Sequence, residues 1–177
     1  IPIAFLVLGA AGFFVGTLVH KYSMISGSGI PQVKGVIMGY FKNNWFSTLI
    51  AKFVGGAVSI LGGLSLGREG PSIQLGACIA QGVGDKFATS RTEKKILIAS
   101  GAGAGLAAAF NAPLAGAMFA MEEIFKYLSP VVLLSTMAAA VASDFVSKII
   151  FGNSPIFHFS VEGNIPLSGY WLLFILG

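Results

Sequence analysis

Hydrophobic and polar positions in this chain form long apolar stretches, separated by short polar or glycine-rich breaks. A helix that spans a bilayer needs about 20 residues to cross a hydrocarbon core of roughly 30 Å. Four stretches approach or exceed that length and are predicted to span: residues 1–19, 46–66, 96–121 and 131–151. Several such stretches in one chain are not a signal peptide. The pattern therefore predicts an all-α protein that crosses the membrane several times.

Shorter apolar segments lie between these stretches. One of them, residues 33–40, follows a polar, glycine-rich break, and another ends near residue 83. Non-helical backbone at membrane depth must be buried in protein or face a cavity. Short segments interrupted by glycine and proline therefore indicate broken helices that line a binding site, as in transporters.

The segment F-N-A-P-L interrupts the third long stretch after a helix predicted for residues 96–110. Asn111 is predicted to be an N-cap, and Pro113 fits the first turn of a new helix, where its missing N–H costs nothing. That helix would run to E-E-I-F-K. Residues 85–95 are the most charged part of the chain and are expected in water or among lipid headgroups.

Composition narrows the class further. Of 177 residues, 55% are hydrophobic and 10% are charged, and the mean hydropathy is +0.82. Soluble domains carry roughly 25% charged residues, so a water-soluble protein is excluded. The net charge of +4 is spread over loops, which favours interfacial anchoring over nucleic-acid binding. The single Cys78 excludes an internal disulfide and a cysteine metal cluster, and we expect neither a metal nor a cofactor.

Glycine is frequent, with 24 residues. Three pairs are spaced four residues apart, at positions 12 and 16, 35 and 39, and 101 and 105. In a membrane, small residues at this spacing let helix backbones approach closely. We therefore expect tightly packed helices at these places.

Two breaks share a pattern of glycines followed by proline: G-S-G-I-P at 27–31 and G-R-E-G-P at 67–71. Because proline favours the first helical turn, each break should deliver a helix N-terminus. Such an end carries unpaired N–H groups and a partial positive charge, which suit an anion. The glycines let the loop turn its amides toward the ion, and Ser28 adds a hydroxyl donor. Taken alone, G-S-G-I-P can equally be an ordinary turn.

Arg68 and Glu69 are the only charged residues between positions 53 and 84. Charges in apolar surroundings are costly and usually functional. A carboxylate at a helix N-terminus mimics the anion bound there, so Glu69 would occupy the site when ionised and leave it when protonated. Glu69 would then be a gate, and Arg68 would point toward a structural partner or the interface. The alternative is an exposed pair in a surface loop.

A second pair of carboxylates, Glu122 and Glu123, lies on the helix that begins near Pro113. Adjacent helical residues point about 100° apart, so the two acids cannot share one role. In one reading, one of the two carboxylates faces a proton path and the other a structural partner. In the alternative, both lie on a solvated helix end and either pairs with Lys126. Lys52, at the start of the uncharged run, would lie near the site or extend to the interface.

The stretches G-S-G-I-P, G-R-E-G-P and G-L-A-A-A-F-N-A-P-L-A-G-A-M-F-A-M-E-E resemble three motifs of the CLC family of chloride channels and chloride/proton antiporters, in the family's order and spacing. The resemblance covers essentially the whole chain. It implies a fold of tilted and broken helices in two inverted repeats, and a homodimer with one anion pore in each subunit. Residues 1–177 would be most of the first repeat, without its first two helices and without the second repeat.

The resemblance also implies roles for single residues. Chloride would be bound by Ser28, Gly29, Ile30, Arg68, Glu69 and Gly70. Ser28 would contribute its hydroxyl, and the second break its backbone amides. Glu69 would be the external gating glutamate and would also carry protons. Glu123 would be the internal proton-transfer glutamate, and Lys52 would be a basic residue near the pore. Ser28 argues for chloride over nitrate and, together with Pro71, against the fluoride exporters.

A glutamate at the position of Glu123 is typical of exchangers in the family. We therefore predict a proton-coupled chloride antiporter, with a passive channel gated by voltage or pH as the alternative. A membrane scaffold without transport is a third hypothesis, under which Ser28 and Glu69 are dispensable. An enzyme is not expected, because the chain has no Ser-His or Cys-His pairing and no HExxH motif. Gln32 and Lys34 stand where some relatives have acids, so the electrostatic potential of the inner vestibule would differ from theirs.

Both ends of the chain lie in apolar runs, so we expect a fragment of a longer protein. Residues 152–168 are predicted to form a polar surface loop, before an apolar segment at 170–177. The remaining anion ligands of the family belong to the second repeat, and Tyr170 cannot be assigned such a role, so this fragment alone should not form a complete pore. The expected partners are chloride, protons and the lipid bilayer, without nucleic acid. Compact loops favour a prokaryotic inner membrane.

Overall fold

The computed structural model describes residues 2–127 and 129–152, and these residues form helices without strands. The elements are α1 (Pro2–Lys21), the 3-10 turn η1 (Ser23–Ile25), α2 (Ile30–Met38), α3 (Trp45–Leu61), α4 (Glu69–Phe87), α5 (Arg91–Phe110), α6 (Pro113–Phe119), the π-helical turn η2 (Ala120–Phe125) and α7 (Pro130–Phe151). The prediction of an all-α chain is confirmed. Residues 153–168 of the predicted loop and the segment 170–177, with Tyr170, lie outside the described residues.

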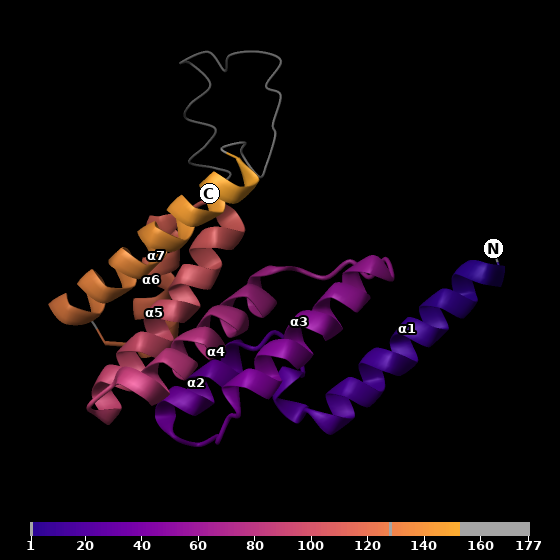
Figure 1. Cartoon of the computed structure of the whole chain (residues 1–177), viewed down its shortest axis with the longest axis horizontal. Helices are drawn as coiled ribbons and strands as arrows, with labels where there is room; N and C mark the ends of the chain where they lie inside the picture. Colours follow the sequence, from indigo (N-terminus) through magenta and orange to yellow (C-terminus); the bar gives the residue numbers. More distant parts are fainter. Residues whose placement is uncertain (1, 128, 153–177) are drawn as a thin grey trace, which may run out of the picture.

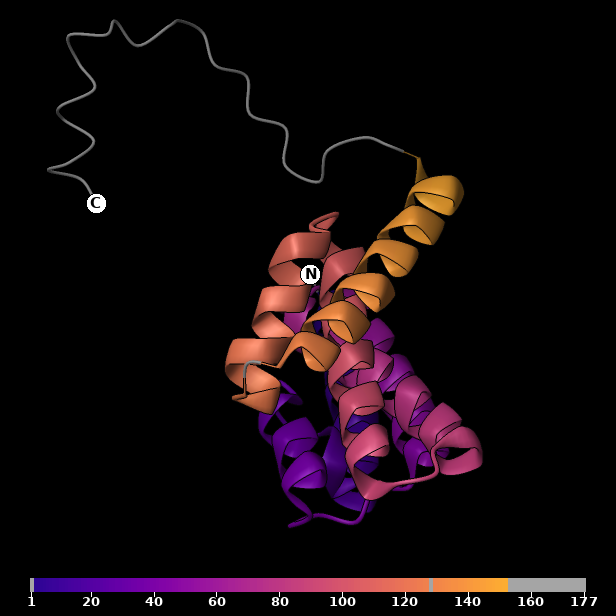
Figure 2. The same ribbon diagram turned by 90° about the vertical axis from the view of Figure 1, so that its left-hand side faces the viewer.

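The helices pack as a series that follows the chain (Figure 1). α1 lies at one edge beside α3, α3 contacts α4, and α4 contacts α5. At the other end α5, α6 and α7 lie side by side, as Figure 2 shows from a second direction. The short helix α2 contacts α4, α5 and η2. This arrangement brings the first break, which precedes α2, against the second break, which precedes α4.

The second predicted span is shorter than its apolar pattern indicates, and the third is interrupted after Phe110, as predicted. The second ends at Leu61 rather than near residue 66, because Gly62 caps α3 and Gly63 adopts a left-handed φ of 85°. The third is divided at Asn111, which is the C-cap of α5 with a φ of 52°. The prediction of Asn111 as an N-cap is therefore wrong, and asparagine is one of the few residues that tolerate this left-handed backbone.

The start of α5 also differs from the prediction, since it begins at Arg91 within the charged stretch. The Ser90 hydroxyl accepts a hydrogen bond from the Glu93 amide at 3.1 Å. The Glu93 carboxylate in turn accepts from the amide and the hydroxyl of Thr89, at 2.8 and 2.6 Å. Reciprocal bonds of this kind satisfy the first-turn amides and extend a helix into polar sequence.

One of the four predicted spans meets a length and composition test for crossing a membrane. Among the described residues, only α7 is long and apolar enough. Trp45–Leu61 is apolar but shorter, and α1 counts here only over Phe5–Lys21, because the side chains before Phe5 lie outside the described part. The third predicted span is divided between α5, whose first turns are charged, and the seven-residue helix α6.

The glycine spacing predicts close packing in one of three places. A Cβ at Gly101 would meet the Gly76 carbonyl oxygen at 2.5 Å, and a Cβ at Gly105 would collide with the Ser72 carbonyl oxygen. The backbones of α4 and α5 therefore touch, as predicted. At the other two places no second helix lies close. Described atoms leave 4 Å of open space around Gly12, Gly16 and Gly39, whereas a Cβ at Gly35 would collide with the Phe41 ring in the loop after α2.

The main apolar core lies where α2, α4, α5 and η2 meet. Its buried members are Val33, Ile37, Ile73, Ala77, Ile98, Ala99, Ala102 and Ile124. Because α2 is only nine residues long, burial of one face in this core, rather than its length, stabilises it. The core therefore fixes the position of the first break.

Candidate functional site

Each break delivers a helix N-terminus, as predicted. Gly29 is the N-cap of α2 with a φ of 94°, and Pro31 lies in the first turn. Arg68 is the N-cap of α4, and Pro71 lies in its first turn. A side chain at position 29 would be strained in this backbone, which explains the glycine. The first amides of both helices lack partners within their own helix.

The two helix N-termini are in direct contact. A Cβ at Gly70 would collide with the backbone carbonyl of Ser28, and a Cβ at Gly29 would lie 2.6 Å from the Gln74 side-chain oxygen. The Gln74 amide also donates a 2.7 Å hydrogen bond to the Met24 carbonyl. The loop before α2 thus packs on the first turns of α4, and only glycine permits so close an approach. Two positive helix ends are brought to one place.

Ser28 and Glu69 are both exposed at this place, whereas Gly29 and Gly70 are buried. The Glu69 carboxylate folds back over Gly67, where an added Cβ would collide with it. The carboxylate therefore lies beside the N-terminus of α4 rather than away from it. That Glu69 occupies an anion site at this helix end stays a prediction.

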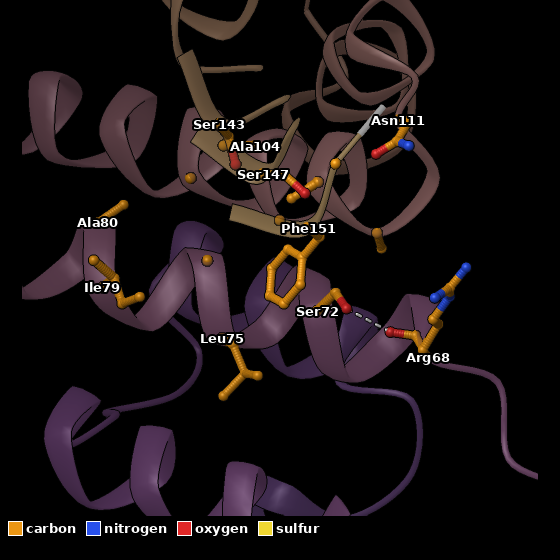
Figure 3. Close-up of a pocket in the computed structure, with 16 residues that line it drawn as sticks. Arg68, Ser72, Leu75, Ile79, Ala80, Ala104, Asn111, Ser143, Ser147 and Phe151 are labelled. Carbon is orange, nitrogen blue, oxygen red and sulfur yellow. Dashed lines mark hydrogen bonds between the residues drawn. The ribbon is translucent and has the colours of Figure 1, made fainter. Parts of the chain in front are cut away.

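Arg68 points away from the two breaks. Its guanidinium lies 5.9 Å from the centre of the Phe110 ring on α5, and its carbonyl accepts a hydrogen bond from the Ser72 hydroxyl. Figure 3 shows this side chain at the edge of a groove of about 960 Å³ between α4, α5 and α7. The expectation that Arg68 points to a structural partner is consistent with this position.

Lys52 on α3 is buried, with 6% of its surface exposed. Its ammonium donates hydrogen bonds to the carbonyls of Ile25 and Gly27, at 2.9 and 2.8 Å. The alternative in which Lys52 extends to the interface is therefore wrong. Lys52 holds the loop immediately before Ser28 in place, because two carbonyls of that loop accept hydrogen bonds from its one ammonium group.

Replacing Lys52 by methionine is expected to lower the free energy of unfolding of the full-length protein by about 1–3 kcal/mol, because two carbonyls lose a charged donor. Denaturant unfolding of the purified protein measures this change. Lys42→Met is the matched control, since Lys42 is exposed in the loop before α3. Equal destabilisation by both replacements would contradict the assigned role of Lys52.

Glu122 and Glu123 lie on the π-helical turn η2 and have different surroundings. Glu122 is exposed. Glu123 accepts a hydrogen bond from the Lys34 ammonium of α2 and forms an ion pair with it. The prediction that the two acids have different roles is consistent with this difference. In the alternative reading Lys126 pairs with either acid, but the described partner of Glu123 is Lys34. A π-turn changes the direction of side chains relative to a regular helix, and such turns are frequent at functional sites.

The structure does not bring Glu69 and Glu123 together. Each flanks the same buried apolar core, since Ile73 lies one turn after Glu69 and Ile124 follows Glu123. Glu69 lies with the two helix N-termini, and Glu123 lies with Lys34. Sequence reasoning did not predict the Lys34–Glu123 pair, because the two residues are 89 positions apart and no local pattern connects them.

Comparisons with known proteins give one consistent result. A family model described as "Voltage gated chloride channel" matches residues 11–177. The chain is 38% identical over 184 residues to the H(+)/Cl(-) exchange transporter ClcA of Citrobacter koseri, covering 99% of this chain and 38% of that protein. It is 36% identical to the protein of the same name from Salmonella arizonae, with the same coverage.

A solved structure is also similar to this chain. It is the X-ray crystal structure of a slow cyanobacterial Cl-/H+ antiporter, with a TM-score of 0.85 and 36% sequence identity. The match covers 98% of this chain and 42% of that one. The chain thus spans 38% of the length of the curated relatives named above and less than half of the solved one.

Proposed function

This chain belongs to the voltage-gated chloride channel family, as its three motifs predicted, and from this we propose that it is part of a proton-coupled chloride antiporter. The observation that carries the proposal is the contact between the two breaks. Ser28 meets Gly70 backbone to backbone, so the N-termini of α2 and α4 converge. Converging helix ends form an anion site from partial charges, and such a site binds an ion yet lets it leave.

The chloride ligands in this proposal come from both breaks. They are the Ser28 hydroxyl and the backbone around it, together with the amides that begin α4: Ser28, Gly29, Ile30, Arg68, Glu69 and Gly70. Arg68 contributes only its backbone, which fits a guanidinium that faces Phe110. Lys52 supports the site from behind through the loop carbonyls that it binds.

Glu69 is the proposed gate. Its carboxylate lies next to the N-terminus of α4, where an anion would otherwise bind. When ionised, it competes with chloride for the helix end; when protonated, it loses the charge that holds it there and leaves. Anion occupancy and proton binding are then coupled through one side chain.

Glu123 is the proposed second proton carrier. It lies across the apolar core from Glu69, at a partly exposed position where a proton can enter from solution. A passive channel needs no such carboxylate, and this difference favours the antiporter. The relatives named as H(+)/Cl(-) exchange transporters point in the same direction.

We place the chain in the first of two inverted repeats of an integral membrane protein, without the first two helices of that repeat. The full-length protein would be a homodimer in a lipid bilayer, with a prokaryotic inner membrane as its location. This chain matches 38% of the length of the relative from Citrobacter koseri, which agrees with its being part of one repeat. The rest of the pore would come from the second repeat.

Coupled flux in liposomes tests the proposal. With the full-length protein reconstituted, an outward chloride gradient is expected to drive protons inward against their own gradient, which an external pH electrode records in weak buffer. Liposomes without protein are the control. Chloride movement without proton movement would identify a passive channel, and movement of neither ion would contradict the anion site itself.

A further inference from the structure

The ion pair of Lys34 and Glu123 joins two distant parts of the chain. Lys34 lies on α2, the helix that starts at the first break, and its ammonium donates to the Glu123 carboxylate on η2. The Lys34 side chain is 21% exposed and that of Glu123 is 46% exposed. Lys34 lies about 6 Å along the helix axis from Ile30. The pair therefore connects the proposed proton carrier to the helix that presents the proposed anion site.

We propose that Lys34 is a positioning residue for Glu123. The Lys34 ammonium holds the Glu123 carboxylate ionised and in one direction, and thereby sets the pH range in which Glu123 accepts a proton. The proposal rests on the proposed function, in which Glu123 carries protons. An ammonium beside a carboxylate favours the ionised form, so the incoming proton must displace this interaction. Once Glu123 is neutral, the attraction that ties η2 to α2 is lost.

Other charged groups in the described part form no hydrogen bond or ion pair with Glu123, although Lys126 acts on its carboxylate electrostatically from farther away. η2 packs against α2, α5, α6 and α7, and α6 has no charged residue. The charged residues of α5 and α7 in the described chain are exposed or bond to other partners: Arg91, Glu93, Lys94, Lys95, Asp144 and Lys148. On the segment itself, Glu122 and Lys126 are exposed. Lys34 is therefore the cation in contact with Glu123 among the described residues.

Three variants of the full-length protein test the role of Lys34. Lys34→Met keeps the length of the side chain and removes its charge, Lys34→Arg restores the charge, and Lys126→Met removes a nearby cation that does not contact Glu123. Each is reconstituted in liposomes, and proton-coupled chloride flux is measured while pH is varied on the side that η2 faces.

In Lys34→Met, the pH at which coupled flux is half-maximal is expected to rise by about one unit, since Glu123 then accepts a proton more easily. Lys34→Arg is expected to restore the wild-type midpoint, and Lys126→Met to shift it less than Lys34→Met. A purely structural role would lower the rate without moving the midpoint.

An unchanged midpoint in Lys34→Met would overturn the proposal, as would a shift that arginine does not reverse. If the methionine variant does not fold, Lys34→Gln gives the same test, because it also removes the charge. A wild-type protein that moves chloride without protons would instead show that the proposed function is wrong, and the inference would fail with it. The two failures are therefore distinguishable.

Discussion

Replacing Gly70 by alanine is expected to reduce chloride transport by the full-length protein by about 10- to 100-fold. The added Cβ would collide with the backbone carbonyl of Ser28, and a backbone group cannot rotate away as a side chain can. The collision must therefore separate the N-termini of α2 and α4. Chloride efflux from liposomes, measured with a chloride electrode, gives the result.

Gly56→Ala is the matched control for this experiment. Gly56 lies within α3, and described atoms leave 4 Å of space around the position of an added Cβ. Both replacements exchange glycine for alanine within a helix, so the main difference between them is the collision at position 70. Equal rates for Gly70→Ala and Gly56→Ala would show that the contact between the breaks does not determine transport.

Replacing Glu123 by glutamine is expected to reduce proton movement to the background of protein-free liposomes, while chloride still moves. Glutamine has nearly the same shape and can still accept a hydrogen bond from Lys34, but it cannot take up a proton. The anion site at the two breaks is left unchanged. Simultaneous recording of external pH and chloride gives the proton-to-chloride ratio that this prediction concerns.

Glu122→Gln is the control, because it makes the same chemical change one residue earlier at an exposed position. The ratio of protons to chloride is expected to stay at its wild-type value in this variant. Loss of coupling in both variants would mean that the charge of η2 as a whole matters, and not one carboxylate. Loss in Glu122→Gln alone would reverse the assignment.

The positions of the two helix N-termini could be predicted from the sequence because their signals are local. Glycines followed by proline determine the backbone over four or five residues, with little help from distant parts of the chain. Gly29 and Pro31 at the start of α2, and Pro71 at the start of α4, behave in this way. The same reasoning correctly placed Pro113 in the first turn of α6.

The parts that could not be predicted depend on contacts between distant segments. Two contacts arise only when α2 packs against α4 and η2: the close backbone approach of Gly70 to Ser28, and the ion pair of Lys34 with Glu123. Asn111 shows a different limit. Asparagine is common both at helix starts and at left-handed helix ends, so its identity alone did not decide between them.

The two hydrogen bonds of Lys52 have a consequence for ion selectivity. Backbone carbonyls in loops are the groups that coordinate sodium and potassium in cation-selective filters. Here the carbonyls of Ile25 and Gly27 already bind the ammonium of Lys52, which acts as a tethered cation in their place. A second cation at the same two oxygens would be disfavoured, because it would lie close to the Lys52 ammonium. Under the proposed function, this tethered ammonium would disfavour a metal cation beside the chloride ligands.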